Sequence, residues 1–229
     1  MSAELLINVT PSESRVVLIE NGILQEIQVE RHTKRGLVGN IYRGKVSRVL
    51  PGMQAAFVDI GLEKAAFLHA SDIVIHNEIA EEVSASHIQK QDIREHVRDG
   101  QDIVVQVVKD PIGTKGARLT TDITIPSRYL VFMPSVTHVG VSQRIEEEAE
   151  RERLKNRVQE FCDENGGFIL RTAAEGVGKA ELQQDAAFLR RLWDKIQSRM
   201  KKRKSNVLYE DLPLARRVLR DFVGTELDR

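Results

Sequence analysis

The stretch GLVGNIYRGKVSRVLPGMQAAFVDIGLEKAAFLHA, residues 36–70, decides the fold. Glycines at positions 36, 39, 44, 52 and 61 separate short runs rich in β-branched and aromatic residues. Turn signals at such regular spacing between short strands are typical of a closed barrel or a sandwich. A further strand is expected at 102–109, and a glycine-rich turn connects it to the run 117–121. The β-rich region therefore extends well beyond residue 70.

A small antiparallel sheet is expected at the start of the chain. Residues 4–9 and 15–20 are β-prone, and Asn21-Gly22 separates the second of these runs from a third at 23–29. An Asn-Gly pair adopts positive φ at little cost, which a two-residue hairpin turn requires. The second and third runs are therefore predicted to form a hairpin.

Strand and helix signals alternate after residue 123. The clearest helix begins near Lys179, because apolar residues recur at i, i+3 and i+4 from Leu182 to Met200. Earlier in the chain, the polar segment 71–100 is expected to be a surface insertion with helical tendency. The other elements expected after residue 123 are strands at 129–133 and 168–172 and helices at 145–163 and 209–222.

Composition excludes several classes of protein. The one cysteine, Cys162, can form neither an intramolecular disulfide nor a cysteine-based zinc site. The N-terminus lacks a signal-peptide pattern, and no apolar run approaches the ~20 residues that span a bilayer. These features fit a cytoplasmic protein without membrane contact. The 34 basic residues balance the 34 acidic ones, but nucleic-acid binding depends on local clusters of Lys and Arg.

Two phenylalanines make the barrel region a candidate site for single-stranded RNA. Phe57 and Phe67 lie on neighbouring expected strands among small residues, and rings on the outside of a small barrel stack on unpaired bases. Lys45, Arg48 and Lys115 are candidates to neutralise nearby phosphates. The alternative is that both rings belong to the core, which is the commoner place for a strand phenylalanine.

A second candidate site lies at the end of the strand expected at 168–172. Arg171-Thr172 is followed by the glycine-bearing loop 173–178 and then by a helix. Backbone N–H groups at such a loop and helix start face an anion, Arg offers a fork for two phosphate oxygens, and Thr adds a hydroxyl donor. A terminal phosphate fits this chemistry. The alternative is a surface ion pair with a helix cap.

No catalytic residue, metal site or cofactor is expected in this chain. The acidic run 146–150 lies on a helix rich in Arg and Lys, where salt-bridged surface carboxylates are the usual case. Cleavage of a phosphodiester with Mg²⁺ requires closely grouped carboxylates, which this sequence does not suggest. Four histidines without ligand spacing are expected to be surface polar residues: His69, His76, His87 and His96.

The spacing of turn glycines and aromatic residues resembles a known RNA-binding module. The pattern G-x-I-Y-x-G-K-V…F-V-D-I-G…F-L-H-A-S-D-I is similar to the S-one type of OB-fold. The segment I-L-R-T-A-A-E-G-V-G resembles the five-prime sensor of the ribonuclease E and G family. The first resemblance implies that Phe57 and Phe67 lie on the RNA face with Lys115 beside them. The second implies that Arg171 and Thr172 receive the 5′-monophosphate of an RNA end.

The family resemblance also covers the surroundings of the sensor. It implies that the backbone amide of Val131 joins the pocket and that Arg144 supports it. Ribonuclease E carries arginine where this chain has Gln143, so the supporting charge differs.

The same resemblance implies an α+β fold. A small five-stranded OB-type barrel and an α/β sensor domain would both be inserted in a partial ribonuclease H-like subdomain. The expected parts are the first half of that subdomain at 1–35, the barrel at 36–122, the sensor at 123–206, and the return to the subdomain at 207–229. The end at residue 229 is expected to truncate this last part.

The resemblance implies the RNA-binding and 5′-monophosphate-sensing part of a single-strand-specific endoribonuclease that acts in rRNA maturation and mRNA decay. Mg-dependent cleavage is expected from a downstream domain absent here, and zinc from the subunit junction of a homo-oligomer. Two alternatives remain, a stand-alone OB-fold RNA-binding factor and a protein-interaction scaffold. The Arg171-Thr172 pocket would distinguish the family member from the first, and RNA binding would exclude the second.

Overall fold

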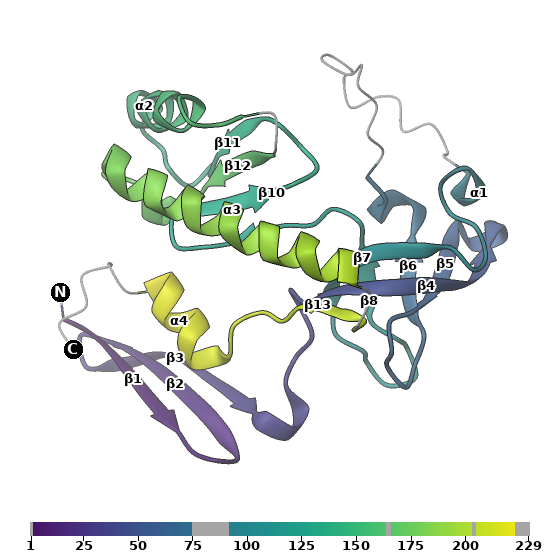
Figure 1. The fold of residues 1–229 in the computed structure, drawn as a ribbon. Coiled ribbons are helices and arrows are strands. Elements are labelled where there is room, and N and C mark those ends of the chain that lie inside the picture. Colours follow the sequence, from purple (N-terminus) through teal and green to yellow (C-terminus); the bar gives the residue numbers. More distant parts are fainter. Residues whose placement is uncertain (1, 75–91, 164–165, 203–204, 223–229) are drawn as a thin grey trace.

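The computed structural model describes residues 2–74, 92–163, 166–202 and 205–222. Three sheets organise these residues, as Figure 1 shows: an N-terminal sheet, a barrel, and a sheet covered by two long helices. The expected insertion at 71–100 falls mostly on residues 75–91, outside the described residues. Its described end contains the short helix α1 (Ile93–His96). None of the described helices is long and apolar enough to cross a membrane.

The N-terminal sheet is antiparallel and contains β1 (Ala3–Val9), β2 (Glu13–Glu20) and β3 (Ile23–Arg31) in that order. Asn21 at φ 51° and Gly22 at φ 76° form the turn between β2 and β3, which confirms the predicted hairpin. The helix α4 (Leu214–Phe222) packs on this sheet through a small cluster around buried Val16. The sheet therefore shares its core with a segment about two hundred residues away.

Five strands close the barrel in the order β4-β5-β6-β8-β7, and β7 pairs back with β4. The barrel strands are β4 (Ile41–Leu50), β5 (Ala55–Asp59), β6 (Ala66–His69), β7 (Asp102–Lys109) and β8 (Arg118–Thr120). A sixth strand, β13 (Val207–Tyr209), adds to the start of β4 from outside the closed ring.

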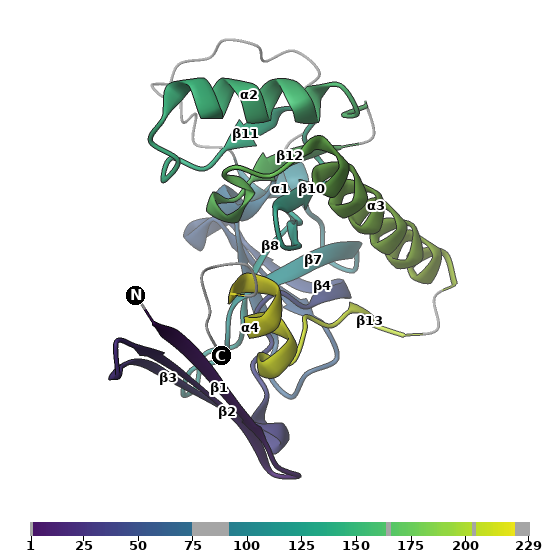
Figure 2. The same cartoon turned by 90° about the vertical axis from the view of Figure 1, so that its left-hand side faces the viewer.

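The third sheet has the strand order β11-β12-β10-β9. The helices α2 (Glu148–Gln159) and α3 (Lys179–Lys202) lie beside this sheet, as Figure 2 shows. They contact each other and share one core with Phe132 and Phe168 of the sheet. The strands are β9 (Ile125–Pro126), β10 (Leu130–Met133), β11 (Val139–Val141) and β12 (Gly167–Leu170).

The expected fold class is confirmed, a closed five-stranded barrel with a mixed α/β region. Two helices are shorter than expected. The helix expected at 145–163 spans Glu148–Gln159, because Ile145 closes a turn with Ser142 instead. The helix expected at 209–222 begins only at Leu214, because residues 207–209 pair with β4. The assignment of the chain's two ends to a ribonuclease H-like subdomain stays a prediction.

Candidate nucleic-acid interface

The two phenylalanines lie on the outer surface of the barrel. Phe57 is directly opposite Phe67 across β5 and β6, and the rings meet edge to face with centroids 6.2 Å apart. Both rings are half-buried, whereas the neighbours Ala56, Val58 and Leu68 are fully buried in the barrel core. Successive side chains of a strand alternate between faces, so the small and aliphatic residues turn inward and the rings turn outward.

Basic residues extend the pair of rings into a row across the barrel. The strand register places Arg48 opposite Phe57, Arg118 opposite Phe67, and Lys109 opposite Arg118. We call these five residues the aromatic row. Aromatic faces flanked by cations are the arrangement with which OB-fold barrels hold the bases and the backbone of a single strand. Arg118 and Lys109 had not been singled out from the sequence.

A carboxylate and a histidine lie beside the row. Asp72 binds the Arg118 guanidinium through both of its oxygens, at 2.8 and 3.1 Å, and raises the pKa of Arg118, so this cation is held charged and in a fixed plane. The ring of His69 is 6.4 Å from that of Phe67, and its Nδ1 lies 2.8 Å from the Ser71 hydroxyl. The alternation of β6, which places positions 67 and 69 on one face, was the signal that could have identified His69.

The predicted lysines differ in their surroundings. Lys115 is exposed in the turn before β8, where Gly116 approaches Ala65 so closely that a Cβ would lie 1.9 Å from its carbonyl oxygen. This close approach brings the turn that carries Lys115 to the start of β6, and the role predicted for Lys115 on the RNA face stays a prediction. Lys45 is exposed on β4 between Asp59 of β5 and Asp102 of β7. Its neighbours in the strand register are therefore two carboxylate residues.

Arg171 lies just past β12, which ends at Leu170, and its guanidinium is held from one side. Nη1 donates to the Ser127 carbonyl at 2.6 Å and to Asp221 Oδ1 at 2.7 Å. The opposite edge, Nε and Nη2, makes no hydrogen bond to a residue that the structure describes. That edge is a two-donor fork of the kind that binds two phosphate oxygens.

Asp221 connects Arg171 to α4. Burial alone would raise the pKa of Asp221, but hydrogen bonds from Arg220 and Arg171 outweigh it and the pKa lies below its ordinary value. Arg220 also lies 3.6 Å from Asp211 in the connection after β13. Arg171 thus ends a chain of alternating charges, and no sequence pattern pointed to Asp221 as its partner.

The other predicted pocket residues lie at different distances from this fork. The Thr172 hydroxyl is 3.2 Å from that of Ser142, and the backbone N–H of Arg144 donates to the same Ser142 hydroxyl. The structure therefore brings Thr172 and the Arg144 loop together beside Arg171. Val131 lies within β10, opposite Ile169 of β12. The role predicted for its backbone amide stays a prediction.

The glycine-bearing loop 173–178 already holds an anion of the protein itself. The Gly176 N–H donates to Glu150 Oε1 at 2.8 Å, and Arg153 pairs with the same carboxylate. The hydrogen bond from Arg153 is the largest influence on Glu150 and lowers its pKa to about 2. This contact fixes the loop against α2, and it uses a donor that the sequence had suggested for a ligand.

A second internal carboxylate, that of Asp185, fixes the turn at residues 127–130, to which Arg171 donates a hydrogen bond. Asp185 on α3 accepts hydrogen bonds through Oδ2 from the Ser127 hydroxyl at 2.5 Å, the Tyr129 N–H at 2.9 Å and the Leu130 N–H at 3.0 Å. Ser127 is only 4% exposed. Arg171 is thus positioned by a turn that is itself held by α3.

Within the described ranges, no group of three or more His, Cys, Asp or Glu side chains is close enough to hold a metal ion. The predicted absence of a catalytic site is not tested by this observation.

Two family models match the chain, the ribonuclease E/G family over residues 124–229 and the S1 RNA binding domain over residues 37–119. Ribonuclease G of Escherichia coli strain K12 is 67% identical over 230 residues, which cover 100% of this chain and 47% of that relative. Ribonuclease G of Haemophilus influenzae is 62% identical, with the same coverage of each chain.

A more distant relative is ribonuclease E of Buchnera aphidicola subsp. Schizaphis graminum. It is 34% identical over 97% of this chain and 23% of the relative. The chain spans about half the length of the curated ribonuclease G proteins that it matches.

Proposed function

Because the chain belongs to the ribonuclease E/G family and contains an S1 RNA binding domain, we propose that it is the single-strand RNA-binding and 5′-monophosphate-sensing part of an endoribonuclease. The observation that carries the proposal is the aromatic row, with two half-exposed rings between cations on one barrel face. Stacking on rings tolerates every base, so this face would select single strands with little sequence preference.

The 5′-monophosphate is the proposed ligand of Arg171 and Thr172, with Arg144 and the Val131 amide as supporting groups. The Nε–Nη2 edge, which makes no hydrogen bond to a described residue, and the nearby Thr172 hydroxyl support this assignment, because a terminal phosphate offers more oxygens than an internal phosphodiester. Asp221 adds a negative charge at the opposite edge of the guanidinium. A triphosphate carries more charge than a monophosphate and would be repelled more strongly.

Cleavage is proposed for the whole protein and not for these residues. The proposed enzyme is a Mg-dependent endoribonuclease of the cytoplasm that acts in rRNA maturation and mRNA decay as a homo-oligomer with zinc at its subunit junction. The metal chemistry is assigned to parts of the relatives that this chain does not cover. A stand-alone OB-fold factor is the disfavoured alternative, because the ribonuclease E/G family model matches the region after the barrel.

The test compares one single-stranded RNA with a 5′-monophosphate and with a 5′-hydroxyl, using fluorescence anisotropy. We expect the monophosphate to bind more tightly by about 1.5–3 kcal/mol, the range for a hydrogen bond to a charged group. Arg171→Ala should abolish this difference, and Arg171→Lys should restore only part of it, because an ammonium lacks the planar fork. Equal affinity of the folded wild-type chain for both RNAs would refute the proposed recognition of the 5′-monophosphate by Arg171. Failure to bind either RNA would refute the whole proposal.

A further inference from the structure

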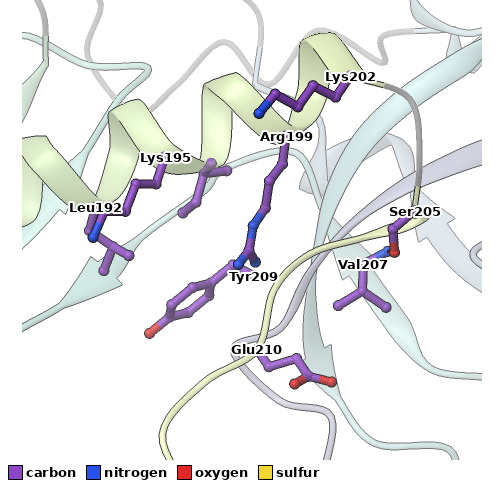
Figure 3. A pocket seen from close by; sticks show the side chains of 9 residues that line it. Leu192, Lys195, Arg199, Lys202, Ser205, Val207, Tyr209 and Glu210 are labelled. Carbon is purple, nitrogen blue, oxygen red and sulfur yellow. The ribbon is translucent and has the colours of Figure 1, made fainter.

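The surface between α3 and β13 contains a groove of about 680 Å³ that none of the proposed sites uses. Figure 3 shows its two walls. One wall is the C-terminal part of α3 and the other is the segment around β13. The described lining residues are Leu192, Lys195, Ile196, Arg199, Lys202, Ser205, Val207, Tyr209 and Glu210.

Cations are concentrated on the helix wall. Lys195, Arg199 and Lys202 follow each other at i, i+4 and i+7, which places them on one side of α3. Arg199 Nη1 donates to the Leu208 carbonyl at 2.9 Å, so its guanidinium reaches across the groove, as Figure 3 shows. Against these three cations the described lining holds one carboxylate, that of Glu210. The described lining of the groove therefore carries a net positive charge.

The remaining lining is apolar and aromatic. Ile196 is only 1% exposed and Leu192 is half-buried on the helix, while Val207 and the Tyr209 ring come from the opposite wall. Cations along one wall beside a ring and aliphatic side chains form a two-sided surface. Such a surface suits a nucleic-acid strand whose phosphates follow the helix and whose bases face the ring.

The same side of α3 leads back to the sensor. Asp185, which holds the turn gripped by Arg171, lies two heptads before Arg199, about 21 Å away at the rise of a helix. Between them Phe188 is 51% exposed at the i−7 position from Lys195. An exposed ring and then three cations thus follow one side of the helix from the sensor turn to the groove.

We infer that the groove between α3 and β13 binds the phosphodiester backbone of single-stranded RNA downstream of its 5′ end. This inference rests on the proposed function, because it continues the path of an RNA whose 5′-phosphate is at Arg171. The groove would hold the strand by charge and would be indifferent to sequence.

The experiment measures RNA affinity as a function of salt for the 229-residue chain. The groove variant is Lys195→Gln/Arg199→Gln/Lys202→Gln, and the control variant Arg31→Gln/Lys34→Gln/Lys155→Gln removes three exposed cations elsewhere. The affinity falls with salt, and each lost phosphate contact to a single strand makes the slope of log K against log salt shallower by about 0.7. The groove variant should therefore lose about 2 from its slope with a 5′-monophosphorylated RNA of ~15 nucleotides. Between ~50 mM and ~200 mM salt, the wild type should lose about 20-fold more affinity than this variant.

The comparisons separate this inference from the proposed function. An RNA of ~5 nucleotides fits within the site size of one OB-fold. Phe57→Ala should lower the affinity of the chain for this short RNA, and the groove variant should leave that affinity unchanged. Because Arg199→Gln also removes the contact with Leu208, Lys195→Gln/Lys202→Gln serves as a milder variant, expected to lose about 1.4 from the slope.

Three outcomes would overturn the inference. The first is wild-type binding that Phe57→Ala weakens while the groove variants leave the slope unchanged. The second is an equal loss of slope in the control variant. The third is competition by a polyglutamate peptide as strong as by RNA, which would assign the groove to an acidic protein segment. A wild-type chain that binds neither RNA would refute the proposed function itself.

Discussion

The aromatic row and the Arg171 pocket are both proposed to bind RNA through cations, but different interactions hold their side chains in place. The rings of the row are positioned by backbone ladders between β5, β6 and β8, so their direction follows from strand alternation. Arg171 is positioned by Asp221 on α4 and by the turn at Ser127, which Asp185 on α3 holds in place. Substitutions on the barrel face should therefore change RNA affinity without changing the free energy of unfolding. Substitutions around Arg171 should change both.

The largest effect should come from Asp185→Ala. This change removes three hydrogen bonds to one carboxylate oxygen and leaves two backbone N–H groups, those of Tyr129 and Leu130, without that acceptor, while the buried Ser127 hydroxyl keeps only its longer contact with the Leu130 carbonyl. We expect the free energy of unfolding to fall by about 3 kcal/mol in urea denaturation. Asp194→Ala, on an exposed aspartate of the same helix, is the control and should stay within about 0.5 kcal/mol of wild type. Equal stability of both variants would show that side chains do not hold the pocket.

Phe57→Ala and Phe67→Ala test the other side of the comparison. Each should weaken single-stranded RNA binding by about 1–3 kcal/mol through lost stacking. The melting temperature should change little, because neither ring is part of the barrel core. Ile27→Ala, on a 59% exposed residue of the N-terminal sheet, should leave RNA affinity unchanged. Unfolding of the phenylalanine variants in a thermal melt would instead place the rings among the stabilising core residues.

Asp221→Asn should sharpen the account of the pocket. The amide oxygen can still accept from Arg171, but the negative charge beside the proposed phosphate site is gone. The preference for a 5′-monophosphate over a 5′-hydroxyl should rise by about 1 kcal/mol at low salt, roughly fivefold. Taking the ratio of two RNAs on the same variant cancels any loss of stability from the broken Arg220 pair. A falling preference would mean that Asp221 serves mainly to orient Arg171.

The smallest effect concerns Glu150 and pH. Its pKa in the folded chain is about 2, below its ordinary value of 4.5. A lowered folded pKa stabilises the protein above pH 4.5, and this contribution is lost as the pH falls toward 2. Between pH 4.5 and pH 2 the free energy of unfolding should fall less in Glu150→Gln than in wild type. The difference between the two proteins should be about 1 kcal/mol at most. Parallel pH profiles for the two proteins would contradict the Glu150 contact as a source of acid sensitivity.

Turn residues and apolar spacing predicted many of the individual strands and helices, while the closed five-stranded barrel was expected from the family resemblance. The Asn21-Gly22 hairpin, the barrel strands and the long helix from Lys179 could all be identified, because turn chemistry and apolar spacing are local properties. The strand β13 could not, because the three residues Val207–Tyr209 become a strand only by pairing with β4. Its short length also explains why the following helix was expected to begin too early.

The candidate sites divide along the same line. The outward direction of Phe57 and Phe67 is encoded in their own neighbours, since small and aliphatic residues alternate with the rings. The partners of Arg171 and Arg118 are not encoded in neighbouring residues, because Asp221 and Asp72 lie about fifty residues from them in the chain. Tertiary packing determines which of the many acidic residues pair with these arginines. It also determines that Glu150 accepts the hydrogen bond of the Gly176 N–H. Local spacing fixes which way a side chain points along a strand or helix, but only the packed chain brings its partner within hydrogen-bond distance.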